Sequence, residues 1–232
     1  MKNIYLVLLS FLFICSCSST LDVKDNPEPA DPKFSYLALG DSYTIGESVI
    51  ETKRWPVQLA ERLRDRGFKM AAPKIIAKTG WTTADLLRGI ENELNVQRDF
   101  DLVSILIGVN NQYQGKSITE YEEELRQVFR KAINHSKTRE KGVFAVSIPD
   151  YGYTPFGSAN QEEISEEIDR FNSVFRRVAE DFDVDFYNIT PISRDAADNP
   201  ELVANDGLHP SGLMYQYWVD QFVNQVAEKL HE

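Results

Sequence analysis

Residues 36–47 read YLALGDSYTIGE, and this stretch decides which class of fold the chain is expected to adopt. It opens with a continuous apolar run, as in a strand that is buried on both faces of a parallel sheet. The run stops at Gly-Asp-Ser, so Ser42 comes directly after the expected strand. An ordinary strand-to-helix turn and a serine presented for chemistry both fit this stretch, and the rest of the sequence has to distinguish them.

Similar apolar runs recur along the chain and alternate with amphipathic segments. Strands are expected at 34–40, 74–80, 101–108, 142–149 and 184–190. Helical spacing of apolar residues is found at 55–67, 82–94, 119–135, 162–182 and 211–230. This alternation predicts an α/β protein, a three-layer α/β/α sandwich with a five-stranded parallel sheet. The sequence contains no internal repeat, and residues 34–232 are expected to form one domain.

The composition is that of a globular protein, with 232 residues, 42% hydrophobic and 26% charged. The net charge is −11, and an acidic surface repels phosphate backbones, so no nucleic-acid partner is expected. The sequence has no HExxH motif and no paired histidine or cysteine cluster, so neither a metal nor another cofactor is expected.

Residues 1–16 have the features of a signal peptide. A lysine precedes an apolar run that is too short to span a bilayer. The run ends in Ile14-Cys15-Ser16-Cys17, which resembles a bacterial lipoprotein box and makes Cys17 the expected lipidated residue. A plain secretory signal is the alternative. Residues 17–33 are polar and contain three prolines, so they are expected to be a linker.

Three of the expected strands end at a glycine, namely Gly40, Gly80 and Gly108. The carboxyl ends of parallel strands share one edge of the sheet, where α/β proteins bind ligands. A glycine at that edge lets backbone N–H groups approach a ligand closely. Glycines that simply terminate strands are the alternative, but each of these is followed by distinctive polar residues.

A serine nucleophile needs a base, and the chain has three histidines. Two of them are expected at the surface, in a charged helix and at the penultimate position. His209 lies in NDGLHPSG, at 205–212, and Asp206 precedes it by three residues, within reach of one turn. A carboxylate on the imidazole would fix its tautomer and stabilise the imidazolium. A helix-capping aspartate is the alternative, and Ser42 at a strand end favours the catalytic interpretation.

The same edge supplies candidate donors for an oxyanion. These are the backbone N–H groups of Ser42 and Gly80 and the side-chain amide of Asn110, in IGVNNQ at 107–112. For Asn110, a turn residue that hydrogen-bonds its own backbone is the alternative.

Together, four segments resemble the blocks of the SGNH, or GDSL-type, hydrolases: GDSY at 40–43, the glycine of KTGW at 78–81, GVNN at 108–111 and DGLH at 206–209. The resemblance spans Phe34 to about Leu230 and implies a flavodoxin-like sandwich. It implies that Ser42 is the nucleophile and first oxyanion donor and that Gly80 and Asn110 are the other donors. His209 would be the base and Asp206 its partner.

The sequence departs from the family pattern at two positions. Tyr43 stands where the name of the family has leucine, and Asn111 stands where many members have aspartate. Neither change replaces a catalytic atom, so both are expected to affect only the shape of the pocket.

The expected function is hydrolysis of carboxylic acyl or acetyl esters by an exported, lipid-anchored enzyme of the bacterial cell envelope. Its partner would be a small-molecule or glycan ester, because aromatic residues crowd the expected rim, with Trp55 the one most readily assigned to the core instead. These residues are Tyr43, Trp55, Trp81, Tyr113, Tyr151, Tyr153 and Phe156. A lysophospholipase or thioesterase, a flavodoxin-like module binding a phosphorylated ligand, and a non-catalytic lipoprotein are the alternatives.

Overall fold

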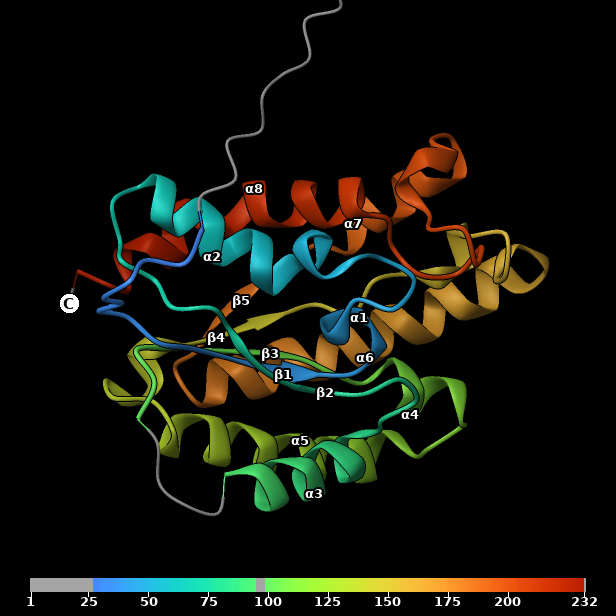
Figure 1. The fold of residues 1–232 in the computed structure, drawn as a ribbon. Helices are drawn as coiled ribbons and strands as arrows, with labels where there is room; N and C mark the ends of the chain where they lie inside the picture. The colour runs from blue at the N-terminus through green and yellow to red at the C-terminus, as the bar shows by residue number, and fades with distance from the viewer. Residues whose placement is uncertain (1–26, 95–98, 232) are drawn as a thin grey trace, which may run out of the picture.

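The computed structural model describes residues 27–94 and 99–231, and a parallel sheet lies at its centre (Figure 1). The strands are β1 (Tyr36–Gly40), β2 (Lys74–Ala77), β3 (Leu102–Leu106), β4 (Val143–Val146) and β5 (Asp185–Tyr187). All neighbouring strands pair in parallel, in the order β2-β1-β3-β4-β5. This is the flavodoxin-like order of doubly wound sheets, and the order reverses between β1 and β3. The predicted α/β/α sandwich is confirmed.

Long helices cover both faces of the sheet. The helices α2 (Trp55–Asp65) and α8 (Gly212–Glu228) pack together on one face, above the sheet in Figure 1. On the other face, α3 (Thr83–Glu93) packs against α5 (Ile118–Asn134), which packs against α6 (Gln161–Asp181). Shorter helices are α1 (Ser42–Ile45), α4 (Val109–Tyr113) and α7 (Thr190–Arg194). Single 3₁₀ turns are η1 (Glu51–Lys53), η2 (Arg139–Gly142), η3 (Tyr151–Tyr153), η4 (Ser158–Asn160), η5 (Asp195–Ala197) and η6 (Pro200–Leu202).

The expected strands and long helices are all present, but the strands are shorter than their apolar runs. The run at 101–108 leaves the sheet after Leu106, and the run at 184–190 leaves it after Tyr187, where Thr190 begins α7. Ile107, Ile148 and Ile189 lie beyond the strand ends and are still fully buried, so hydrophobicity alone does not mark where pairing stops.

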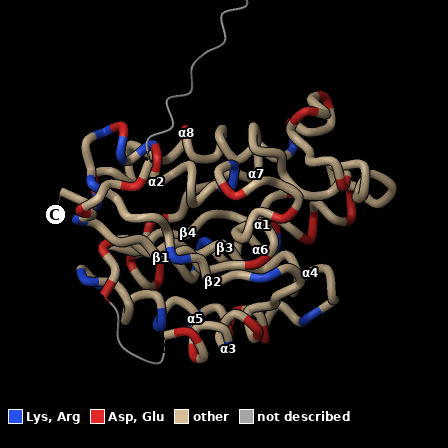
Figure 2. Tube along the Cα trace, in the orientation of Figure 1, with Lys and Arg blue, Asp and Glu red and all other residues tan. Residues whose placement is uncertain are grey.

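The core lies on both sides of the central strands. All residues of β1, β3 and β4 are buried, and these strands carry no charged residue, whereas Lys, Arg, Asp and Glu lie mainly on helices and loops (Figure 2). Trp55 is fully buried and packs edge-on against Phe144 and Phe222. Its expected place at the rim is therefore wrong, and Trp55 belongs to the core between α2, α8 and the sheet.

The predicted signal peptide, Cys17 and the first part of the predicted linker lie outside the described residues. In the described part of the linker, the Glu28 carboxylate accepts a hydrogen bond from the backbone N–H of Ala72, at 3.0 Å. The backbone N–H of Lys33 donates to the carbonyl of Lys69, at 2.8 Å, just before the domain begins. Within residues 27–94 and 99–231, no helix is both long and apolar enough to cross a membrane.

Candidate active site

Ser42 begins α1 directly after β1 ends, at the carboxyl edge of the sheet. The Asp41 side chain caps this short helix by accepting a hydrogen bond from the backbone N–H of Tyr43, at 3.0 Å. Glycine is required at position 40, because a Cβ there would lie 2.2 Å from the Thr44 hydroxyl and 2.5 Å from the Leu106 carbonyl oxygen. Strand and helix therefore meet in a tight turn that places Ser42 at the edge.

Asp41 is fully buried beneath this turn. Burial raises the pKa of its carboxyl group to about 7, although backbone hydrogen bonds, the one from Tyr43 among them, act in the opposite direction. The second oxygen, Oδ2, has no hydrogen-bond partner among the described residues.

His209 and Asp206 meet as the sequence predicts. The Asp206 Oδ1 accepts hydrogen bonds from the backbone N–H groups of Leu208 and His209, both at 2.9 Å, while Oδ2 lies 2.7 Å from His209 Nδ1. Gly207 turns the chain between them with a φ of 73°. Partial burial alone would raise the pKa of Asp206, but hydrogen bonds from Ser48 and from the backbone of His209 and Leu208 outweigh it and hold the pKa well below its ordinary value.

Gly80 and Asn110 follow β2 and β3 at the same edge. Gly80 has a φ of 83°, in the left-handed region that favours glycine. The Asn110 amide nitrogen donates to the Trp81 carbonyl at 3.0 Å. An amide has two N–H groups, so this bond fixes the side chain and leaves the second N–H for a ligand.

Asn111 plays a structural part instead. Its side-chain oxygen accepts from the backbone N–H of Thr83 at 3.0 Å, and its nitrogen donates to the Thr83 hydroxyl at 2.7 Å. Asn111 is buried and joins the start of α3 to the start of α4. The departure from aspartate at this position therefore changes a contact behind the loops rather than the wall of the pocket.

One cavity of about 190 Å³ collects the candidate residues. Ser42, Gly80, Asn110 and His209 all line it, and Asp206 stands behind His209. The rest of the wall is largely aromatic and apolar, formed by Tyr43, Val109, Tyr113, Tyr151, Phe156 and Leu208 together with Thr79. The fold thus brings residues from four distant segments to a single concave site.

The expected aromatic rim divides into two groups. Tyr43, Tyr113, Tyr151 and Phe156 line the cavity. The side chains of Tyr113 and Phe156 are 61% and 53% exposed, and their ring centroids lie 6.3 Å apart. The other three rings do not line this cavity: Trp55 is in the core, Trp81 packs against Gly89 of α3, and Tyr153 lies beside the Arg194 guanidinium.

Hydrogen bonds hold Tyr151 in the wall. Its hydroxyl donates to the Gln112 side-chain oxygen at 3.0 Å, and the Gln112 nitrogen donates to the Glu167 carboxylate at 2.5 Å. The buried Asp150 accepts from the backbone N–H of Gly152 at 2.8 Å and so shapes the η3 turn that carries Tyr151. Sequence reasoning missed the hydrogen bonds of Tyr151, because Gln112 and Glu167 lie far from it and from each other along the chain.

Two further residues at the site were not expected from the sequence. The Ser48 hydroxyl donates to Asp206 Oδ2 at 2.5 Å, and Thr79, which lines the cavity, donates to the Glu47 carboxylate. Among residues 27–94 and 99–231, no three His, Cys, Asp or Glu side chains are grouped so that they could hold a metal ion.

Comparison with known proteins assigns the chain to a protein family. It matches the GDSL-like Lipase/Acylhydrolase family over residues 38–217, most of its length, and therefore belongs to that family. The protein is accordingly an ester hydrolase. Comparison with the sequences of curated proteins gives no match.

Solved structures share the fold at low sequence identity. The acetylxylan esterase Axe2 from Geobacillus stearothermophilus is 19% identical, with a TM-score of 0.66 over 84% of this chain and 94% of that one. A lipase/acylhydrolase from Enterococcus faecalis is 20% identical, with a TM-score of 0.66 over 84% and 96%. A structure named TesA is 18% identical, with a TM-score of 0.65 over 84% and 99%.

Proposed function

We propose that the protein cleaves carboxylic acyl or acetyl esters with Ser42 as nucleophile, His209 as base and Asp206 as the partner of His209. The observation that carries this proposal is the convergence of Ser42, Gly80, Asn110 and His209 on one cavity, with Asp206 hydrogen-bonded to the imidazole. These residue types in this arrangement meet the requirements of acyl transfer, namely a nucleophile, an oriented base and oxyanion donors.

In the first half-reaction, Ser42 Oγ attacks the ester carbonyl carbon, and its proton passes to Nε2 of His209. The negative oxygen of the tetrahedral intermediate is stabilised by the backbone N–H groups of Ser42 and Gly80 and by the free amide N–H of Asn110. The intermediate collapses, the alcohol leaves with the proton from His209, and an acyl-serine remains. Asp206 stabilises the imidazolium throughout, through the Nδ1–H bond.

In the second half-reaction, a water molecule takes the place of the alcohol. His209 accepts a proton from the water as its oxygen attacks the acyl carbon. The second tetrahedral intermediate collapses to the carboxylic acid, and Ser42 recovers its proton from His209.

For the substrate, we propose a carbohydrate ester or another ester of the envelope or the extracellular space. The support is the pair of exposed rings, Tyr113 and Phe156, which face solvent beside the cavity that holds Ser42. Exposed apolar patches of this kind mark binding sites, and flat aromatic faces suit the apolar faces of sugar rings. Two of the structures with the same fold are named as acetylxylan esterases, which agrees with this choice.

A substrate screen tests the proposal. Acetylated xylo-oligosaccharides, short- and long-chain nitrophenyl esters, a lysophospholipid and an acyl thioester are offered to the wild-type protein and to Ser42→Ala. We expect kcat/KM to be highest for the acetylated glycan, and the kcat of Ser42→Ala to be lower by about 10³-fold or more on every substrate, with the fold intact. Near wild-type turnover in Ser42→Ala would overturn the mechanism, and preference for the lysophospholipid or thioester would overturn the substrate.

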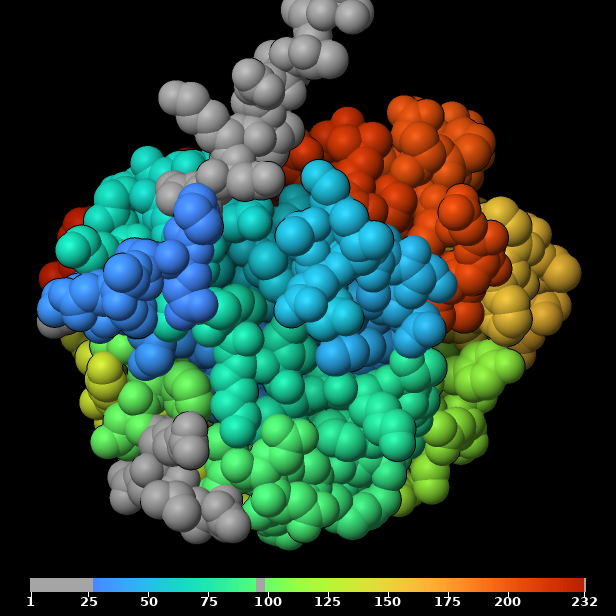
Figure 3. Space-filling model, in the orientation of Figure 1, coloured from blue at the N-terminus to red at the C-terminus, as the bar shows by residue number. Residues whose placement is uncertain are grey.

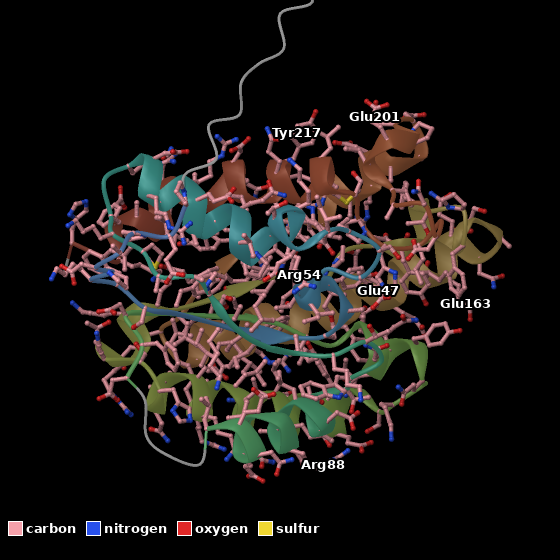
Figure 4. All side chains as sticks on the ribbon, in the orientation of Figure 1. Glu47, Arg54, Arg88, Glu163, Glu201 and Tyr217 are labelled. Atoms are coloured by element: carbon pink, nitrogen blue, oxygen red, sulfur yellow. The ribbon has the colours of Figure 1, made fainter. Side chains whose placement is uncertain are left out.

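The aromatic rim has its own test. Tyr113→Ala and Phe156→Ala should raise KM for the glycan ester and leave kinetics on nitrophenyl acetate nearly unchanged. Tyr217→Ala is the matched control, since Tyr217 is also an exposed ring, 44% accessible, but lies on α8 away from the cavity (Figure 4). Equal effects of all three substitutions would remove the rim from glycan binding.

A further inference from the structure

Ser48 reaches the site from the segment that follows the nucleophile's own helix. Its hydroxyl donates to Asp206 Oδ2, the same oxygen that meets His209 Nδ1. The two residues are 158 positions apart in the chain. In Figure 3 the segment after α1, in light blue, lies against the orange-red segment that contains Asp206.

The Asp206 carboxylate is fully engaged by this contact. An ionised carboxylate offers about four lone-pair positions. The backbone N–H groups of Leu208 and His209 occupy Oδ1, while His209 Nδ1 and the Ser48 hydroxyl occupy Oδ2. Ser48 therefore fills the remaining position on the oxygen that serves the imidazole, where water would otherwise bind.

The backbone around Ser48 is constrained. Ser48 has a φ of 63°, a left-handed conformation that is strained for a residue other than glycine. Gly46 also has a positive φ, of 71°, and a Cβ there would lie 2.4 Å from the Arg54 side chain. Both Glu47 and Arg54 are labelled in Figure 4, close to α1. Such strain persists only where the surrounding structure holds it, and it is found most often at functional sites.

The neighbouring residue makes a second contact across the site. The Glu47 carboxylate accepts a hydrogen bond from Thr79, the residue before Gly80. Consecutive residues of one segment thus touch both the loop that carries Gly80 and the loop that carries Asp206.

We infer that Ser48 is a positioning residue of the hydrolase, which holds Asp206 Oδ2 in register with His209. This inference rests on the proposed roles of Ser42, His209 and Asp206. Ser48 touches no reacting atom, and it acts through the carboxylate.

Loss of the hydroxyl has a defined electrostatic consequence. The Ser48 bond lowers the pKa of Asp206, so its removal raises that pKa and makes the carboxylate a stronger acceptor for the imidazolium proton. The base is then protonated, and so unable to accept the serine proton, up to a higher pH. The acid limb of kcat/KM should move to higher pH. The substitution leaves the other ionisable groups near Asp206 unchanged. These groups are Tyr43, Asp41, Asp150, Glu47 and Tyr215.

Two substitutions separate the hydroxyl from the backbone strain. Ser48→Ala removes the hydroxyl and keeps a Cβ in the left-handed conformation, whereas Ser48→Gly removes the hydroxyl and relieves the strain. Both should lower kcat on nitrophenyl acetate by about twofold to tenfold, the value of one ordinary hydrogen bond, and both should move the acid limb upward. Ser48→Gly should unfold at higher urea than Ser48→Ala, with the same kinetics.

Thr79→Val is the control for a general loosening of this segment, and only its acid limb and its NMR spectrum are compared, because Thr79 lines the cavity and its kcat is free to change. It breaks the Glu47 contact, leaves the charge of Glu47 in place and does not touch Asp206. Its acid limb should coincide with that of the wild type. The hydrogen-bonded Nδ1–H resonance of His209, observed by NMR without substrate, should move in both Ser48 variants and stay in place in Thr79→Val.

Wild-type kcat, acid limb and Nδ1–H resonance in both Ser48 variants would overturn the inference. The same movement of the acid limb and of the Nδ1–H resonance in Thr79→Val would also overturn it, because the effect would then belong to the segment and not to the hydroxyl. His209→Ala and Ser42→Ala are measured alongside. If these two retain activity, the proposed function fails, while their inactivity together with unaffected Ser48 variants refutes the Ser48 inference alone.

Discussion

Asn110 lines the cavity, and its side-chain amide donates a hydrogen bond to the Trp81 carbonyl that holds the side chain in place. A donor that is fixed before the substrate arrives needs no reorganisation as charge develops on the oxyanion. We expect Asn110→Ala to lower kcat by about 10²–10³-fold with little change in KM. Gln114→Ala is the matched control, since Gln114 contacts the Gly80 carbonyl but does not line the cavity. A rise in KM alone would make Asn110 a substrate-binding residue.

The hydrogen bonds of Asp206 predict how its replacement by asparagine affects activity. In Asp206→Asn, Oδ1 still accepts from the backbone of Leu208 and His209, but an NH₂ group replaces the Oδ2 acceptor of the imidazole. The base must be unprotonated to accept the serine proton, so wild-type kcat/KM should fall toward acid pH. Asp206→Asn should be slower from about pH 5 to 9, though less so than His209→Ala. Full activity would make Asp206 a turn cap only.

Asp41 predicts how stability depends on pH. Its pKa is raised to about 7 in the folded protein, against about 3.9 in an unfolded chain. Between these values the folded state binds a proton that the unfolded state has released, so the contribution of Asp41 to the free energy of unfolding falls as the pH rises from about 4 to 7.

Asp41→Asn keeps an oxygen for the Tyr43 N–H and removes the titration. Relative to the wild type, we expect the variant to gain about 1–4 kcal/mol between pH 4 and 8, measured by urea unfolding at each pH. Asp101→Asn should show little pH dependence relative to the wild type above about pH 5, because hydrogen bonds from Lys137 and Ser35 outweigh partial burial and lower the pKa of Asp101. Its stability relative to the wild type should fall only as the pH rises through the acid range up to about 4. A difference between Asp41→Asn and the wild type that does not vary with pH would refute the assignment.

At the scale of elements, α3 supports the oxyanion side of the site through the Trp81 ring. A Cβ at Gly89 would lie 2.4 Å and 2.6 Å from two atoms of that ring, while the backbone carbonyl of Trp81 holds Asn110. Replacing a glycine inside a helix by alanine ordinarily raises the free energy of unfolding by about 0.5–1 kcal/mol. Here the ring must move, and overpacking costs about 1–3 kcal/mol.

Gly89→Ala should therefore lower both the free energy of unfolding and kcat. Asn92→Ala, at an exposed position of the same helix, is the control and should be neutral or slightly stabilising. Urea unfolding followed by tryptophan fluorescence, with kcat on nitrophenyl acetate, compares the two. If Gly89→Ala is as stable and active as Asn92→Ala, the ring is free to shift and α3 does not set the position of Asn110.

Across the whole molecule, what could be predicted from the sequence depended on how local each signal was. Continuous apolar runs predicted the strands because a strand buried on both faces has no polar side. The contact of Asp206 with His209 was predictable because it closes within one turn. The four-residue helix α1 was not, since it is too short for a helical period, and no pattern joins Ser48 to Asp206 across the chain.

The anchoring of the whole molecule is the last prediction. We propose that Cys17 is lipidated and that residues 17–33 tether the domain, which at about 3.3 Å per residue keeps it within about 50 Å of the membrane. Expressed in a bacterium, the wild type and Cys15→Ala should sediment with membranes and carry a lipid on an N-terminal Cys17, as read by mass spectrometry of the mature protein.

Cys17→Ala loses the thiol that accepts the lipid, so it should remain unprocessed by the lipoprotein pathway and carry no lipid. Its kcat on nitrophenyl acetate should match that of the wild type, because the site is built entirely from residues beyond the linker. An unmodified residue other than Cys17 at the start of the mature wild-type protein would refute the anchor and favour a plain secretory signal.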